Sequence, residues 1–140
     1  MVKVIMGKKG TGKTKQIIEM VNTAARDEKN CVVCIEGGRK LTYDVSYSVR
    51  LIDVGDYPLA KGYEALQAFI CGVYAHNFDT THIFIDSLYK VSGCSNIEAA
   101  EKFIRELNEF SVKNNFEITI MISDDAMNAT EGMREFFVQQ

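Results

Sequence analysis

The clearest chemical signal in the sequence is a run of glycine, lysine and threonine close to the N-terminus. Residues 7–14 read GKKGTGKT and match the pattern G-x-x-x-x-G-K-[ST] without a mismatch. Glycines at these positions let successive backbone N–H groups point at one anion, and a helix that follows adds the positive end of its dipole. We therefore expect a phosphate-binding loop made of Gly7, Lys8, Lys9, Gly10, Thr11, Gly12, Lys13 and Thr14.

Two side chains of this loop, and one later carboxylate, have separate chemical roles. Lys13 is expected to reach the β- and γ-phosphate oxygens and to act in catalysis by balancing their charge. The hydroxyl of Thr14 is expected to coordinate Mg²⁺. Asp86 follows the apolar run His82–Ile85, which is typical of a Walker B strand that delivers a carboxylate to the metal. The expected cofactors are ATP and Mg²⁺.

Hydrolysis also requires a group that orients or deprotonates water. The residue after Asp86 is Ser87, so this strand brings no second carboxylate. Glu36 ends the apolar run at 31–35, and parallel strands end at the same edge of a sheet, where ligands bind. Glu36 is therefore the candidate catalytic base, with a surface glutamate as the alternative.

A cation near the terminal phosphate is a further requirement for efficient phosphoryl transfer. Arg39, Lys40 and Arg50 are candidates by their place in the chain. For each of them, an ordinary solvated charge on the surface is the favoured interpretation. A neighbouring subunit or a protein partner is the alternative source, which would make useful turnover depend on a homo-oligomer or a complex.

These residues must be positioned by strands that alternate with helices. Apolar runs predict buried strands, and apolar residues at helical spacing predict amphipathic helices. The strands are expected at 2–6, 31–35, 49–54, 82–85 and 117–122, and the helices at about 13–26, 62–76 and 97–113. The apolar face of the last helix is expected to comprise Ile97, Ala100, Ile104, Leu107 and Phe110.

Alternation of this kind predicts an α/β fold, a three-layer α/β/α sandwich with a mainly parallel sheet. Parallel strands need crossover helices, and uninterrupted apolar strands indicate burial on both faces. The segment 124–140 follows the last strand and mixes apolar residues with acids. It is expected to pack on the core, and an exposed element that docks a partner is the alternative.

Size and charge limit the remaining classes. The 140 residues are 46% hydrophobic and contain one proline, which fits a single globular domain at 1–140. The net charge of −3 gives no general case for binding nucleic acid, although the first fifteen residues hold five lysines and no acid. No apolar run approaches the ~20 residues that cross a bilayer, and no secretory signal is apparent, so we expect a cytoplasmic protein that does not bind a membrane.

Taken together, the order of motifs resembles the core of the RecA-like ATPases, a group of P-loop NTPases. The shared features are a strand, GKKGTGKT and a helix, then a strand ending in Glu36, and later the Ile85-Asp86-Ser87 sequence. The resemblance implies that Glu36 is the general base, that Asp86 serves Mg²⁺, and that Ser123, at the end of the next strand, is a polar sensor near the nucleotide.

A looser likeness connects the chain to small firmicute-type P-loop proteins that are labelled twitching motility ATPases. That label implies a pilus-retraction motor. This sequence has neither the length of such a motor nor a glutamate after Asp86, so we set the label aside.

The sequence as a whole predicts an ATP-binding P-loop protein that acts as a slow, Mg²⁺-dependent ATPase. ATP is favoured over GTP because no N-K-x-D motif follows a strand. One alternative is a nucleotide-dependent switch or adaptor that binds ATP without turnover. Another is a small-molecule kinase, which would need a second pocket and a lid.

Overall fold

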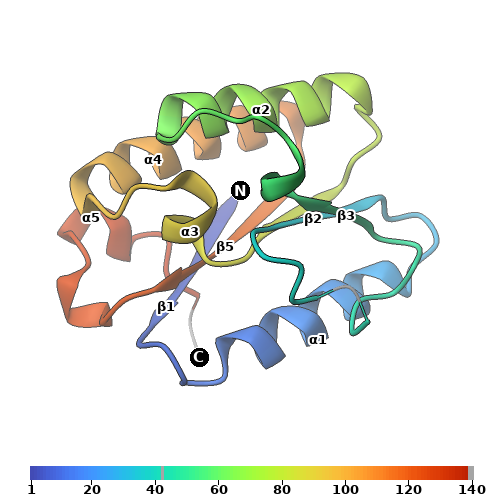
Figure 1. Ribbon diagram of the computed structural model, residues 1–140. Helices are drawn as coiled ribbons and strands as arrows, with labels where there is room; N and C mark the ends of the chain where they lie inside the picture. The colour runs from blue at the N-terminus through green and yellow to red at the C-terminus, as the bar shows by residue number, and fades with distance from the viewer. Residues whose placement is uncertain (42, 139–140) are drawn as a thin grey trace.

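Strands and helices alternate along the chain, as the apolar patterns predict (Figure 1). The computed structural model describes residues 1–41 and 43–138. The strands are β1 (Val2–Gly7), β2 (Val32–Glu36), β3 (Arg50–Asp53), β4 (His82–Ile85) and β5 (Glu117–Ser123). The α-helices are α1 (Lys13–Ala25), α2 (Tyr63–His76), α3 (Leu88–Ser92), α4 (Ile97–Asn114) and α5 (Glu131–Arg134). Within this described part of the chain, no helix has the length and apolar character that crossing a membrane requires.

The five strands form one parallel sheet in the order β1-β5-β4-β2-β3. Parallel pairing places the carboxyl ends of all five strands along one edge. Gly7 is in register with Ser123, and Glu36 is in register with Asp53. Asp86 continues from β4, and its N–H donates to the carbonyl of Ile35 at 2.9 Å. The sheet thus brings the polar residues that end its strands to one side of the molecule.

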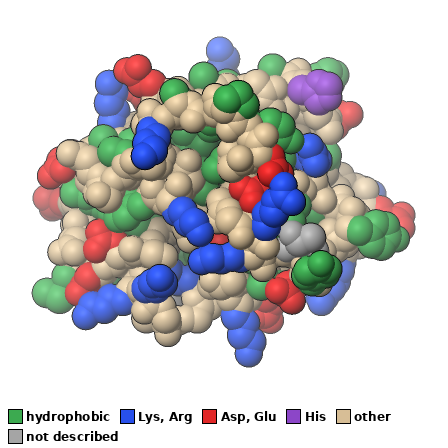
Figure 2. All heavy atoms as spheres, in the orientation of Figure 1, with side chains coloured by type: hydrophobic (Ala, Val, Ile, Leu, Met, Phe, Trp, Pro, Cys, Tyr) green, Lys and Arg blue, Asp and Glu red, His purple; other side chains and the backbone are tan. Residues whose placement is uncertain are grey.

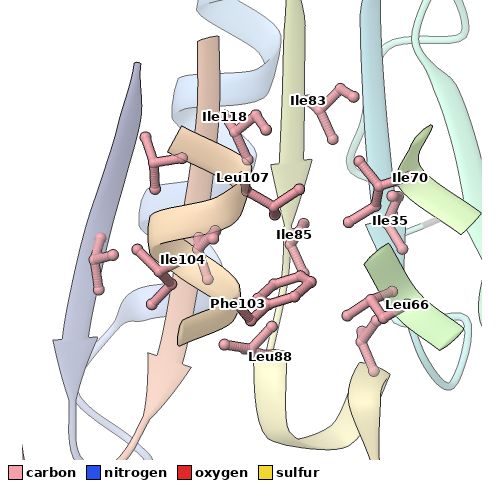
Figure 3. Packing of buried hydrophobic residues seen from close by; sticks show 14 of the residues in the cluster. Ile35, Leu66, Ile70, Ile83, Ile85, Leu88, Phe103, Ile104, Leu107 and Ile118 are labelled. Carbon is pink, nitrogen blue, oxygen red and sulfur yellow. The ribbon is translucent and has the colours of Figure 1, made fainter. Parts of the chain in front are cut away.

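Helices cover both faces of the sheet, which confirms the α/β class and the expected layers (Figure 1). On one face, α1 buries Ile17 and Val21 against Ile5 and Phe84. The other face carries α2, α3 and α4. Figure 3 shows their contribution to the larger core, where side chains of α2 and α4 meet the strands: Leu66, Ile70, Phe103, Ile104 and Leu107 pack with Ile35, Ile83, Ile85 and Ile118.

The C-terminal segment packs against the outer edge of β1. Met133 of α5 is fully buried in the larger core. The N–H of Val4 donates to the carbonyl of Phe136 at 2.8 Å, and the N–H of Val138 donates to the carbonyl of Val4 at 3.1 Å. Core packing, the expected arrangement, is therefore confirmed for residues up to Val138. The helical part of this segment is short, since α5 has four residues.

Candidate functional site

The loop of residues 7–14 connects β1 to α1 and has the backbone conformation that its glycines permit. Gly10 and Gly12 have φ angles of 86° and 84°, in the left-handed region that side chains other than glycine rarely adopt. Gly12 is the N-cap of α1, and its carbonyl accepts from the N–H of Gln16 at 3.1 Å. Because glycine has no capping side chain, the first N–H groups of α1 are left for another acceptor, such as an anion.

Lys13 is held within this loop. Its side chain is buried, with 8% of its surface exposed. The ammonium Nζ donates to the carbonyl of Lys8 at 2.6 Å and lies 3.3 Å from the hydroxyl of Thr11. Burial lowers the pKa of Lys13, although the nearby charge of Asp86 opposes that shift. The structure therefore concentrates positive charge at the first turn of α1.

A cavity of about 460 Å³ opens beside the loop. Its lining comes from the loop, from the ends of β4 and β5, and from two segments outside the predicted motifs. The lining residues are Lys9, Gly10, Gly12, Lys13, Thr14, Lys40, Asp86, Ser87, Tyr89, Lys90 and Ser123. Most predicted site residues therefore meet at one place. Gly7, Lys8 and Thr11 belong to the same loop but do not line the cavity, and the hydroxyl of Thr11 donates to the carbonyl of Lys8 at 2.7 Å.

Strand order explains why Ser123 belongs to this cavity. Strand β5 lies between β1 and β4, so Ser123 stands between the start of the loop at Gly7 and the carboxylate of Asp86. A side chain at the end of β5 is consequently next to any group bound between the loop and Asp86. This position suits the polar sensor role that the resemblance implies for Ser123.

Asp86 is the carboxylate of the cavity wall. It is 6% exposed, and burial raises its pKa, while the charges of Lys40, Lys90 and Lys13 act in the opposite direction. Among described residues, neither Asp86 nor Thr14 uses its side chain in a hydrogen bond with another protein group. Two oxygen donors of this kind fit a hard cation such as Mg²⁺, which takes one or two carboxylates and completes its shell with phosphate and water. Residues 1–41 and 43–138 contain no group of three or more His, Cys, Asp or Glu side chains placed to hold a metal ion.

Two acids that follow β5 fix the beginning of the loop. The N–H of Asp124 donates to the carbonyl of Gly7 at 3.0 Å, and the carboxylate of Asp125 lies 3.4 Å from Nζ of Lys8. Tyr89, which lines the cavity, donates its hydroxyl to the Asp124 carboxylate at 3.0 Å. The motif-based prediction missed this support, and the only signal in the sequence was the pair of acids directly after an apolar strand.

Glu36 is not among the residues that line the cavity. Its side chain is 1% exposed, and Oε1 accepts from the N–H groups of Lys40 at 2.7 Å and Leu41 at 3.1 Å. Its other oxygen, Oε2, is buried without a hydrogen-bond partner among the described residues. Burial raises the pKa of Glu36 against the effect of the two N–H donors, and the charges of Asp53 and Asp86 raise it further. The general-base role stays a prediction, and this geometry gives Glu36 a second role as the anchor of the loop that carries Lys40.

Of the three candidate cations, the structure brings Lys40 to the cavity. Arg39 is ion-paired with Asp56, and its Nε lies 3.9 Å from Oδ2 of Asp53. Arg50 lies on β3, and its guanidinium donates to the carbonyl of Leu51 at 3.4 Å. Neither Arg39 nor Arg50 lines the cavity, and both side chains are exposed, which agrees with the surface-charge interpretation favoured for them.

Replacing Glu36 with Gln is expected to stabilise the protein at neutral and higher pH. Because the pKa of the folded-state carboxyl is raised, the native protein retains a proton that the unfolded chain releases near its usual pKa of about 4.3. The stability that Glu36 contributes is thus fully present below that pKa and is lost as pH rises through the folded-state pKa. Gln keeps the acceptor oxygen and carries no charge, so we expect the free energy of unfolding of the variant to exceed that of the wild type once the pH is high enough for the buried carboxyl to lose its proton.

Denaturant unfolding at about pH 4 and about pH 8 measures this effect. The advantage of Glu36→Gln is expected at the higher pH and should nearly vanish at the lower one. Glu109→Gln, at an exposed position on α4, is the matched control and should change little at either pH. An equal effect of Glu36→Gln at both pH values would show that the buried charge is not the cause.

Comparison with known proteins identifies no family for this chain, so the functional argument rests on the residues of the site. No protein-family model matches the chain, and no curated protein matches it either.

Proposed function

We propose that this protein binds ATP with Mg²⁺ in the cavity beside residues 7–14, as a P-loop nucleotide-binding protein of RecA-like type, and hydrolyses it slowly. The observation that carries the proposal is the convergence of three features. A GKKGTGKT loop joins a buried parallel strand to a helix, Lys13 is buried within that loop, and Thr14 and Asp86 line the same cavity. The cavity volume of about 460 Å³ lies within the ~300–1,000 Å³ usual for small-molecule sites.

Different residues of the site bind the phosphates and the Mg²⁺ ion. Backbone N–H groups of the loop and of the first turn of α1 donate hydrogen bonds to the phosphate oxygens, and Lys13 exchanges the carbonyl of Lys8 for phosphate oxygens. Thr14 and Asp86 are the protein ligands for Mg²⁺, Asp86 directly or through water. When bound, Mg²⁺ neutralises part of the phosphate charge. The protein supplies a fixed, partly desolvated set of charges, which is the main means of catalysis in phosphoryl transfer.

The position of Glu36 favours a second candidate function, a switch that binds ATP and turns it over little or not at all. A general base must touch the attacking water or reach it through one intervening water. Glu36 is 1% exposed and bonded to the loop at 40–41, and Asp86 is the sole acid among the cavity-lining residues. A site with this geometry binds nucleotide more readily than it activates water. A slow ATPase releases phosphate from bound ATP, and a switch that only binds ATP does not, so phosphate release distinguishes the two functions.

Titration calorimetry with ATP, in the presence and absence of Mg²⁺, tests the proposal. We expect binding that strengthens with Mg²⁺, and Asp86→Asn should weaken Mg-ATP binding by about tenfold because it removes the charged metal ligand. Affinity without Mg²⁺ should change much less. Asp79→Asn, at an exposed position before β4, is the control for a lost acid. Absence of binding to any nucleoside triphosphate by the folded protein would overturn the proposal, and phosphate release separates the ATPase from the switch.

A further inference from the structure

The cavity wall away from the phosphate-binding loop carries two lysines that no motif in the sequence identifies as a pair. Lys40 comes from the loop after β2, and Lys90 comes from α3. With Lys9 and Lys13 they make four lysines against one carboxylate, Asp86, among the cavity-lining residues. Figure 2 shows lysine and arginine side chains gathered around acidic groups on this face of the molecule. Such an excess of positive charge is suited to a ligand with several negative charges.

The glycine pair after β2 provides the surface on which Lys90 lies. A Cβ atom at Gly37 would lie 3.7 Å from Cγ of Lys90, and a Cβ atom at Gly38 would lie 2.8 Å from its Nζ. Gly38 also has a φ angle of 100°, which disfavours any other residue. The sequence Gly37-Gly38 thus lets the Lys90 side chain cross from α3 to the loop that carries Lys40.

Lys40 is held in place by its own backbone. Its N–H donates to the buried carboxylate of Glu36 at 2.7 Å, and the preceding residue, Arg39, is ion-paired with Asp56. These anchors on either side of the loop fix the main chain at Lys40 while its side chain is exposed at the cavity. Each residue of the segment 37–40 therefore has a structural role. The glycines leave space for the side chain of Lys90, Arg39 fixes the loop through its ion pair with Asp56, and Lys40 lines the cavity.

We propose that Lys40 and Lys90 form the second side of an anion clamp, opposite residues 7–14, and that this clamp distinguishes a triphosphate from a diphosphate. The inference rests on the proposed function. The loop amides and Lys13 hold the phosphates near α1, so the additional phosphate of ATP is the group that extends toward Lys40 and Lys90. Both lysines belong to the same chain as the loop. A single copy then supplies these cations, and the alternative source, a neighbouring subunit or a partner, is not required for them.

The test compares dissociation constants for ATP and ADP, and for tripolyphosphate and pyrophosphate, by calorimetry at fixed salt. Lys40→Met and Lys90→Met keep most of each side chain's apolar stem and remove its charge. Each is expected to weaken binding of ATP and of tripolyphosphate by about tenfold, with ADP and pyrophosphate changed by less than about threefold. The matched control is Lys61→Met, which lies close to α3 at Gly93 but does not line the cavity.

A positioning variant gives an independent readout. Gly38→Ala places a Cβ 2.8 Å from Nζ of Lys90 and leaves both lysines in the sequence. It should reproduce the selective loss of triphosphate affinity because it displaces the ammonium of Lys90 and strains the main chain that carries Lys40. A thermal midpoint measured for every variant identifies any that fail to fold, and the exposed lysine variants are expected to match the wild type.

The outcomes separate the clamp from the proposed function. Equal losses for triphosphates and diphosphates, or no loss at all, would overturn the clamp while ATP binding still stands. Binding of tripolyphosphate that depends on Lys40 and Lys90, without any binding of ATP, would overturn the proposed function and leave the clamp standing. A folded protein that binds none of the four phosphate compounds would overturn both.

Discussion

Lys13→Ala is expected to weaken ATP binding by more than about 100-fold. Lys13 is 8% exposed as a residue and lines the cavity, where reduced solvation strengthens the attraction of its ammonium to a phosphate. Without it, the phosphates lose a partly desolvated cation that neither water nor a distant lysine replaces. The fold should not suffer, because the hydrogen bonds that Nζ of Lys13 makes with described residues lie within its own loop, at Lys8 and Thr11. Burial also lowers the pKa of Lys13, so the folded state gains nothing from keeping this group charged.

Lys15→Ala is the matched control for this experiment. It removes the same charge two residues along α1, from an exposed side chain that does not line the cavity. Its effect on ATP affinity should be less than about threefold, as for a solvent-screened charge. The measurement is calorimetry with Mg-ATP, with thermal unfolding as the check on folding. If the two variants lose affinity equally, the phosphates do not bind where residues 7–14 and α1 place them.

The parts of the site that the sequence predicts are those with a local cause. The phosphate-binding loop is contiguous, and its glycines require left-handed φ angles that the structure contains at Gly10 and Gly12. Asp86 and Ser123 are not adjacent in sequence, but both follow apolar strands. Parallel pairing then brings them to one edge without further information.

The parts that the sequence does not predict depend on short or irregular segments. Lys90 and Tyr89 come from α3, whose five residues are too few to show a helical period. Ser87, the N-cap of that helix, has a φ angle of 56°, which no propensity indicates. The inward turn of Glu36 likewise depends on the fold of the loop after it. A carboxylate at a strand end looks the same in sequence whether it faces a ligand or bonds to its own chain.

The ends of strand β3 are a further feature that the apolar pattern does not predict. The third strand was expected at residues 49–54 and lies at Arg50–Asp53. The carboxylate of Asp53 accepts from the N–H of Gly55 at 2.8 Å, and a 3-10 turn begins at Val54. A side chain that bonds to the backbone two residues on competes with the ladder of the sheet. The apolar run continues through this point, so its pattern alone overestimates the strand.

Helix α4 illustrates how a correct period still leaves out a large core residue. The predicted face includes Ile104 and Leu107, and the structure confirms that both are buried. It adds Phe103, which lies beside Ile104 on the helix and is 2% exposed. The ring of Phe103 packs against that of Tyr63 on α2, with ring centroids 5.0 Å apart. The buried face of a helix that packs on a sheet is at least about 100° wide. A residue beside the predicted apolar positions, such as Phe103, is therefore also buried when a second helix covers it.

Phe103→Ala is accordingly expected to produce the largest loss of stability among these variants, about 3–5 kcal/mol. The substitution removes the ring that fills the space between α2, α4 and the sheet (Figure 3). Its neighbours Leu66 and Leu88 are themselves fully buried and fixed by other contacts, so the space cannot close completely. Such a loss is a large part of the ~5–15 kcal/mol that holds a domain folded.

Urea unfolding followed by circular dichroism measures the change, and Val112→Ala on the same helix is the control. Val112 is 59% exposed, so its truncation should cost less than about 0.5 kcal/mol. ATP affinity measured on the folded fraction of Phe103→Ala should match the wild type, because the ring does not line the cavity. A loss of less than about 1 kcal/mol would mean that α2 and α4 move together to fill the space, and that this layer is less rigid than the packing around Phe103 indicates.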